Sequence, residues 1–231
     1  MRRGDEKKQA ILDVAERLFY LKGYEQTSVQ DLLDVLGTSK GSFYHHFESK
    51  YAVLETLGQS RAEKALTQAE EALGRETGSL KRIDVLMHFV MPIREGEEQF
   101  LTLLLPMIFS ETGRTLYAQY SQAIADAFLP RLQVLLLQAS EEGMVHLYHP
   151  DHMADMLMAL INRCWYGIAG IMMDARHKNG AIDPADMMER MQAYRFAVER
   201  MLDAPFGSLE IVNLTELVQV ASRVLTELRL G

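Results

Sequence analysis

The 231-residue sequence lacks the features that mark several large classes of protein. Its single cysteine, Cys164, excludes an intrachain disulfide framework and indicates a reducing compartment. The N-terminal segment is charged and has no uninterrupted apolar run, so it does not resemble a signal peptide. No run of about 18 uncharged apolar residues occurs, so we expect no membrane span. The sequence therefore predicts a cytoplasmic protein that does not bind membranes.

Signals for β-strands are also nearly absent, because no segment sustains a two-residue alternation of apolar and polar side chains. Apolar residues instead recur at the three-to-four spacing of amphipathic helices along the whole chain. Hydrophobic residues make up 48% of the chain and charged residues 24%, values that suit a globular protein with a core. We therefore predict an all-α fold.

The N-terminal part reads as a series of short helices with clear ends. A first amphipathic helix carries apolar residues from Ile11 to Leu18 and stops at Gly23. A second opens on a predicted capping box, with Thr27 as the N-cap and Gln30 as its partner at the third helical position. This second helix is too short to be stable alone, so it needs tertiary support.

The second helix closes at Gly37, and Ser39 caps a short third helix that ends near Phe47. Ser49 caps a fourth helix that starts at Lys50. Residues 28–46 therefore read as a helix-turn-helix, supported by the helix before it and the helix after it. We predict a helix-turn-helix domain, a three-helix bundle over residues 1–50, and a larger helical domain over residues 51–231.

Charge is divided unequally between these two parts. Residues 1–50 hold eight Lys/Arg and eight Asp/Glu, whereas the remainder holds 16 and 24. An acidic body excludes a general polyanion binder but permits a local phosphate-binding face at the front. Longer helices are expected in the body, with breaks near Gly74–Gly78, Gly96, Gly113, Gly143–Pro150, Asn179–Pro184 and Ala204–Gly207.

The stretch "TSKGSFYHHFESK", residues 38–50, gathers hydroxyl, imidazole and ammonium groups. His45 and His46 are adjacent and point about 100° apart on a helix, which disfavours chelation of one metal ion. Ser42 and His46 are four residues apart, but no nucleophile elbow or orienting carboxylate accompanies them. Donors that reach phosphates or base edges from a helix fit the composition better, with Phe43 and Phe47 facing inward. We interpret this stretch as a recognition helix rather than as a solvent-exposed helix whose polar residues have no binding role.

The segment from Tyr24 to Leu57, "YEQTSVQDLLDVLGTSKGSFYHHFESKYAVLETL", resembles the DNA-binding domain of TetR-family transcriptional regulators. The resemblance covers roughly the first 55 residues. Leu33, Leu36 and Thr38 depart from the residues common in the family, which affects packing and operator preference rather than the groove-facing positions. The resemblance implies DNA contacts by Thr27, Ser39, Lys40, Gly41, Ser42, Tyr44, His45, His46 and Lys50.

The resemblance also implies a homodimer whose body binds a small-molecule effector that controls binding to double-stranded operator DNA, most simply as a repressor. No cofactor, metal or catalytic residue is expected. Because the body is rich in methionine and aromatic residues, we expect an apolar or aromatic effector. Any one of the candidate pocket residues more often has a role in core packing; the candidates are Phe100, Met107, Phe109, Tyr117, Tyr120, Phe128 and Trp165.

Two segments, 151–179 and 184–201, carry wide apolar stripes that suit a four-helix dimer interface, where the family also places its dimer. The candidate interface residues are Met156, Gly167, Ile171, Met187, Met191, Tyr194 and Val198. Residues 208–230 read as one further helix that either packs over the body or extends the dimer. A helical core without dimerisation would show much the same pattern.

Several alternatives remain open from the sequence alone. Arg94 and Arg163 would suit an acidic effector, and the spacing of His146, His149 and His152 would suit a metal sensor. An enzyme built around these histidines lacks a nucleophile, base and orienting group. The main alternative is a helical small-molecule-binding protein whose helix-turn-helix no longer binds DNA.

Overall fold

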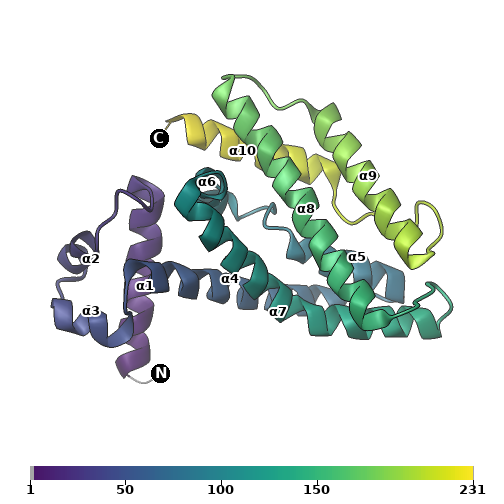
Figure 1. Cartoon of the computed structure of the whole chain (residues 1–231), viewed down its shortest axis with the longest axis horizontal. Coiled ribbons are helices and arrows are strands. Elements are labelled where there is room, and N and C mark those ends of the chain that lie inside the picture. Colours follow the sequence, from purple (N-terminus) through teal and green to yellow (C-terminus); the bar gives the residue numbers. More distant parts are fainter. Residues whose placement is uncertain (1–2, 231) are drawn as a thin grey trace.

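The computed structural model describes residues 3–230 and, within that range, shows an all-α protein of ten helices, as the sequence predicts. A small head formed by the first three helices lies at one end, and α4 runs from it into a larger body (Figure 1). In chain order the helices are α1 (Arg3–Lys22), α2 (Val29–Leu36), α3 (Lys40–His46), α4 (Lys50–Leu73), α5 (Ser79–Val90), α6 (Glu98–Ile108), α7 (Glu111–Glu141), α8 (Pro150–His177), α9 (Pro184–Leu202) and α10 (Leu214–Leu230).

The head has its own hydrophobic cluster, built from α1, α2, α3 and the first turns of α4. Phe19, Leu32, Phe43 and Val53 are completely buried in it, which gives the short helices the support they lack alone. Leu103 reaches this cluster from α6 of the body. The predicted boundary at residue 50 therefore falls at the start of α4, whose first turns pack in the core of the head and whose later turns pack in the core of the body.

The capping box of α2 lies one residue later than the sequence analysis placed it. Ser28, not Thr27, is the N-cap, and Asp31, not Gln30, is its partner at the third helical position. The Ser28 hydroxyl accepts a hydrogen bond from the Asp31 N–H, and the Ser28 N–H donates to the Asp31 carboxylate at 2.7 Å. Thr27 is not free to cap because its hydroxyl is drawn into the head.

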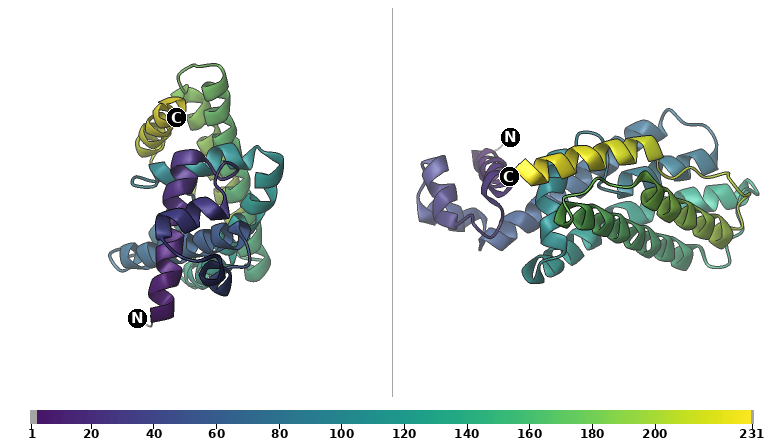
Figure 2. Two further views of the ribbon diagram at one scale, coloured as in Figure 1. Left: turned by 90° about the vertical axis from the view of Figure 1, so that its left-hand side faces the viewer. Right: turned by 90° about the horizontal axis from the view of Figure 1, so that it is seen from above.

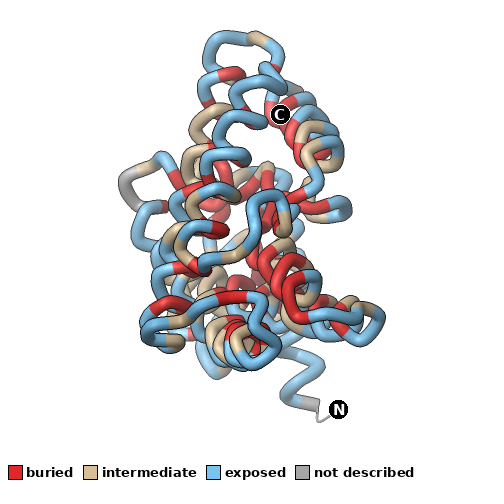
Figure 3. The backbone as a smooth tube through the Cα atoms, turned by 90° about the vertical axis from the view of Figure 1, so that its right-hand side faces the viewer, coloured by how far each residue is buried: buried red, intermediate tan, exposed pale blue. Residues whose placement is uncertain are grey.

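The body is a single core surrounded by the second half of α4 and by α5 to α10. Figure 3 shows the resulting pattern, with buried residues on the inner faces of the helices and exposed residues outside. Pro150 and Pro184 start α8 and α9, at the first helical position where the missing N–H costs nothing. The predicted segments 151–179 and 184–201 thus correspond to two antiparallel neighbours.

Helix α8 is the one helix among the described residues that is long and apolar enough to cross a membrane. Half of its most apolar stretch is buried inside the protein. Residues such as Leu157, Ile161 and Ile168 are buried in the body. The helix therefore has the burial expected of a central core helix.

The C-terminal helix packs against the body and reaches the head. It starts at Leu214, six residues later than the start of the predicted segment 208–230. The preceding residues form a loop because the Asp84 carboxylate accepts hydrogen bonds from the N–H groups of Glu210 and Ile211, at 3.0 Å each. Burial raises the pKa of Asp84, and these two N–H groups oppose the rise. Helix α10 packs on α6, α8 and α9, and its end lies beside α1 in both views of Figure 2.

The junction between α6 and α7 depends on a glycine. Gly113 was predicted to break a helix, but the break falls earlier, at Phe109 and Ser110, and Gly113 lies in the first turn of α7. Ser110 caps that turn by accepting a hydrogen bond from the Gly113 N–H at 3.0 Å. A Cβ at position 113 would overlap the main-chain carbonyl of Met107. Only glycine therefore fits this close approach of two helices.

We expect Gly113→Ala to lower the free energy of unfolding by about 2–3 kcal/mol, because the main chain of α6 must shift to admit the methyl group. Gly41→Ala is the matched control, since a Cβ there meets nothing within 4 Å. Alanine at position 41 removes the entropy cost that glycine imposes on α3, so the free energy of unfolding should rise by about 0.5–1 kcal/mol. Urea unfolding of both variants measures the difference, and equal midpoints would contradict the assignment.

Candidate nucleic-acid interface and ligand cavity

Helix α3 is held at the outer end of the head by local sequence signals. Gly37 takes a left-handed conformation, with φ of +60°, and turns the chain between α2 and α3. Ser39 caps α3 by accepting a hydrogen bond from the Ser42 N–H at 3.3 Å. Phe43 and Phe47 are buried as predicted and seat the helix on the head. The opposite side of α3 is left open to solvent.

That open side carries most of the predicted DNA-binding residues. Tyr44 is 46% exposed, and the Lys40 ammonium lies 5.9 Å from the centre of its ring. The imidazoles of His45 and His46 lie 5.0 Å apart, edge to face. We call the following set the recognition face; its members are exposed or half-buried: Ser39, Lys40, Gly41, Ser42, Tyr44, His45 and His46.

Thr27 does not belong to this surface, which corrects its predicted contact with phosphate. The side chain is 1% exposed, and its hydroxyl lies 2.8 Å from the Gly23 carbonyl and 3.2 Å from the Leu18 carbonyl, both of which accept from it. Thr27 therefore ties α2 to α1 inside the head. The exposed hydroxyl at the start of α2 belongs to Ser28, which the sequence analysis missed.

Lys50 is partly engaged within the head. Its ammonium donates to the Tyr24 carbonyl at 2.6 Å and lies 4.1 Å from the centre of the Tyr24 ring. Burial lowers the pKa of Lys50, with the Glu25 carboxylate opposing the shift, and burial raises the pKa of Tyr24 to about 12. The lysine thus joins the start of α4 to the turn that follows α1.

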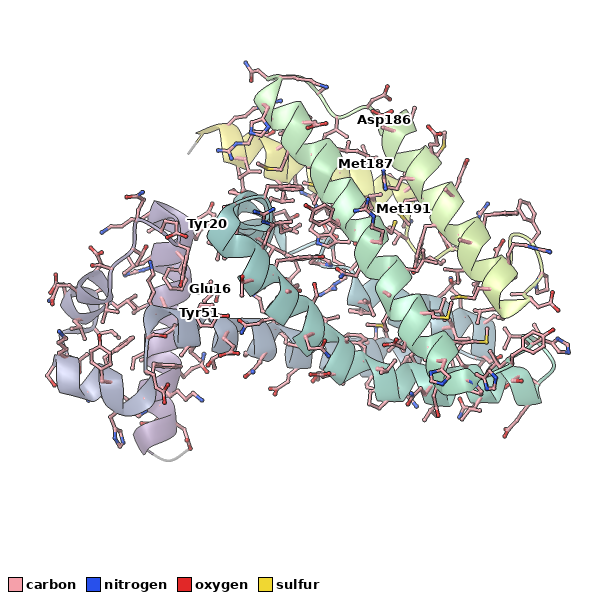
Figure 4. The ribbon with its side chains drawn as sticks, viewed as in Figure 1. Glu16, Tyr20, Tyr51, Asp186, Met187 and Met191 are labelled. Carbon is pink, nitrogen blue, oxygen red and sulfur yellow. The ribbon has the colours of Figure 1, made fainter. Side chains whose placement is uncertain are left out.

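A cavity of about 580 Å³ lies where the head meets the body, lined by residues of α1, α4, α6 and α7. We call it the junction cavity. It brings together four of the seven predicted pocket residues: Phe100, Met107, Tyr117 and Tyr120. Figure 4 shows Glu16, Tyr20 and Tyr51 along this boundary, and of these Glu16 lines the cavity.

The other three predicted pocket residues lie elsewhere. Phe109 is exposed and its ring packs on Tyr166, with centroids 5.2 Å apart, because α6 ends just before it. Phe128 is completely buried in the core of the body. Trp165 lines a second cavity of about 380 Å³ among the end of α5, α7 and α8. Phe109 and Phe128 therefore do not line either cavity.

The two cavities share the wall formed by Tyr117 and Tyr120 of α7. The Tyr117 hydroxyl donates to the Asn162 side chain, and burial raises the pKa of Tyr117 to about 12. The buried indole N–H of Trp165 has no acceptor among the described residues. The wall between the cavities is thus made of two tyrosines, with Gln122 of the same helix beside them.

The charged residues that the sequence offered for other ligands are placed unfavourably for those roles. The Arg94 guanidinium is buried and donates to the carbonyls of Phe89 and Met91, at 2.7 and 2.5 Å. Arg163 lies outside both cavities described above and lines a separate, more open hollow between α8 and α9. Within residues 3–230, leaving aside the few side chains whose placement is not described, no group of three His, Cys, Asp or Glu side chains could hold a metal ion.

The predicted dimer residues divide into two groups. Met187, Met191, Tyr194 and Val198 are buried within the protomer, and Figure 4 shows the two methionines between α8 and α9, so this stripe packs largely against its own chain. Gly167 and Ile171 are half-buried and Met156 is 55% exposed. The most apolar stripe of a helix packs against the core of its own chain, and only the less apolar outer face is left for a partner.

Comparison with known proteins assigns the head to a family. Residues 11–57 match the family model described as bacterial regulatory proteins, tetR family. The HTH-type regulator YerO of Bacillus subtilis, itself uncharacterised, is 35% identical over 80 residues, which cover 35% of this chain and 24% of that protein. The chain therefore matches only about a quarter of that relative's length.

Solved structures extend the similarity of fold to the body. A TetR-family regulator from Pectobacterium atrosepticum aligns with a TM-score of 0.60 at 16% identity, covering 89% of this chain and 99% of that one. A regulator from Saccharomonospora viridis in complex with choline aligns at 0.52 and 21% identity, covering 71% and 85%. The head therefore matches the tetR family of bacterial regulatory proteins over residues 11–57, and most of the chain shares the fold of solved TetR-family regulators.

Proposed function

We propose that the chain is a homodimeric repressor that acts in the cytoplasm, binds double-stranded operator DNA and releases it when a small apolar or aromatic effector binds. The observation that carries the proposal is the recognition face, with its polar side chains open to solvent and its apolar residues seated on the head. A helix exposed in this way at one end of the molecule is suited to enter a major groove.

Each group of the recognition face has a role in this proposal. Lys40 and the hydroxyls of Ser39 and Ser42 bind phosphate oxygens, while Tyr44 and the imidazoles reach base edges. Gly41 lets the DNA backbone approach closely because it has no side chain. Lys50 adds positive charge behind the face, and Ser28 takes the phosphate contact first expected of Thr27.

The junction cavity is the proposed effector site because it touches both parts of the molecule. Its lining includes Glu16 of the head and Tyr117 of the body, and Leu103 of α6 is buried in the cluster of the head. An effector that favours one placement of α6 therefore also favours one placement of the head. Such a ligand shifts the population of head orientations, which is what release from DNA requires.

Dimerisation is proposed through the outer faces of α8 and α9. Met156 on α8 and Phe196 on α9 are large apolar side chains that are 55% and 53% exposed, and both are available to a partner. Ala193 and Ala197 on α9 line a shallow hollow between these helices. Small residues in such a hollow allow the helices of a second copy to approach, giving a four-helix interface.

Fluorescence anisotropy with the chain's own upstream intergenic DNA tests the proposal. We expect binding that weakens steeply with added salt, with a slope of about −0.9 per phosphate contact on a logarithmic scale. A random duplex of equal length is the control, and specific DNA should bind at least about 1,000-fold more tightly. Equal affinity for both duplexes would favour a small-molecule-binding protein whose helix-turn-helix has lost its DNA function.

A further inference from the structure

The wall of the junction cavity already holds a positive charge supplied by the protein. The Arg61 guanidinium of α4 lies 4.1 Å from the centre of the Phe100 ring. Its two terminal nitrogens form ion pairs with Glu16 of α1 and Glu97, just before α6. An aromatic face flanked by two carboxylates is a favourable seat for an organic cation. The position of Arg61 therefore indicates that this wall stabilises a cation.

The rest of the lining carries further negative charge. Glu55, Glu63 and Asp126 also line the cavity, and among the described residues Arg61 is the one lysine or arginine in the lining. None of these three carboxylates is in an ion pair within the part of the chain that is described, although Asp126 accepts a hydrogen bond from Gln122 at 2.7 Å. A cavity lined mainly by one sign of charge concentrates ligands of the opposite sign.

Apart from three glutamines, the remaining lining is aromatic and aliphatic. The Phe100 and Tyr120 rings pack against each other with centroids 5.4 Å apart. Leu54, Leu66 and Leu104 line the same space. A volume of about 580 Å³ falls in the range that encloses a drug-sized molecule. The cavity therefore suits a ligand with an apolar body and a charged end, rather than a metal ion or a small hydrophilic cation.

We propose that the effector is a lipophilic cation, an amine or quaternary ammonium with an aliphatic or aromatic body. The inference rests on the proposed function of the junction cavity as the effector site and names the chemical class of its ligand. The charged end of the effector competes with Arg61 for the Phe100 face and for Glu16. Because Glu16 belongs to the head and Arg61 to α4, this competition weakens an ion pair that fixes the head.

Isothermal titration calorimetry of the full chain with three eight-carbon ligands tests the charge preference. We expect octyltrimethylammonium to bind at least about tenfold more tightly than 1-octanol, and octanoate to bind more weakly than 1-octanol. Added salt should reduce the advantage of the cation. Octanoate or 1-octanol binding as tightly as the cation would overturn the proposal, and so would the absence of binding by all three.

Replacing two carboxylates of the lining by their neutral amide isosteres tests whether the preference for a cation arises in this cavity. Glu63→Gln combined with Asp126→Asn removes two carboxylates of the lining and should weaken octyltrimethylammonium binding about threefold or more while leaving 1-octanol binding unchanged. Glu71→Gln combined with Asp13→Asn is the matched control, because both residues are exposed and lie outside the cavity lining. An equal loss in the control pair would contradict a local effect.

The proposed ligand class and the proposed role of the cavity as effector site fail in different ways. If octanoate binds best and lowers DNA affinity, the cation class is wrong but the cavity remains the effector site. If octyltrimethylammonium binds in the cavity but leaves DNA affinity unchanged, the ligand class is supported and the proposed release mechanism is contradicted. Phe100→Leu, which keeps an apolar side chain but removes the aromatic face, should weaken binding of the cation more than binding of 1-octanol.

Discussion

Replacing Lys40 and Tyr44 together by alanine is expected to weaken DNA binding by about 100-fold or more. Each side chain is exposed on the recognition face, and single base or phosphate contacts of this kind contribute about 1–3 kcal/mol. The buried Phe43 and Phe47 that seat α3 are untouched, so the head should stay folded. Anisotropy with specific and random duplexes measures the loss, and circular dichroism verifies the helix content.

The control for this variant replaces the same residue types elsewhere. Tyr148→Ala combined with Lys178→Ala removes an exposed tyrosine and an exposed lysine from the body, far along the chain from α3. We expect it to bind DNA like the wild type. If the recognition-face variant also binds like the wild type, α3 does not contact DNA and the proposed function fails.

The second large effect is expected at the proposed dimer face. Ala193→Glu places a long side chain in the hollow between the outer faces of α8 and α9, where it would keep the helices of a second copy from approaching closely. We expect the wild type to sediment as a dimer at micromolar concentration and the variant as a monomer. Operator affinity should fall by about tenfold or more because each monomer engages only one half-site.

Val134→Glu gives the matched comparison for this prediction, since Val134 is an exposed apolar residue on α7 that lies outside all three hollows described for the molecule. It should remain dimeric and keep its affinity for DNA. A monomeric wild type, or a dimeric Ala193→Glu variant, would place the interface elsewhere on the protein. Analytical ultracentrifugation at several concentrations separates these outcomes.

The head could be predicted almost entirely from the sequence because its signals are local. Glycine at position 37 and serines at 39 and 49 fix the ends of α2, α3 and α4 within a few residues of the chain. The single misplacement concerns Thr27 and Ser28, two neighbouring hydroxyls that both suit an N-cap. What decides between them is the contact of Thr27 with the Leu18 carbonyl, nine residues away.

The body was predicted less well because its important contacts join distant segments. Periodicity identifies the apolar stripe of α9 but does not say whether α8 of the same chain or a second copy covers it. The ion pairs of Arg61 join residues 45 and 36 positions away, and no local pattern announces them. The junction cavity likewise exists only because four helices from different parts of the chain meet there.

Selection of bound duplexes from a random library tests the central claim most directly, because it asks whether two recognition faces read one stretch of DNA. We predict enrichment of an inverted repeat whose half-sites lie about one helical turn, or a small multiple of it, apart. The Lys40→Ala, Tyr44→Ala variant should enrich nothing above background. Recovery of an unbiased library by the wild type, or of the same repeat by the variant, would contradict the account.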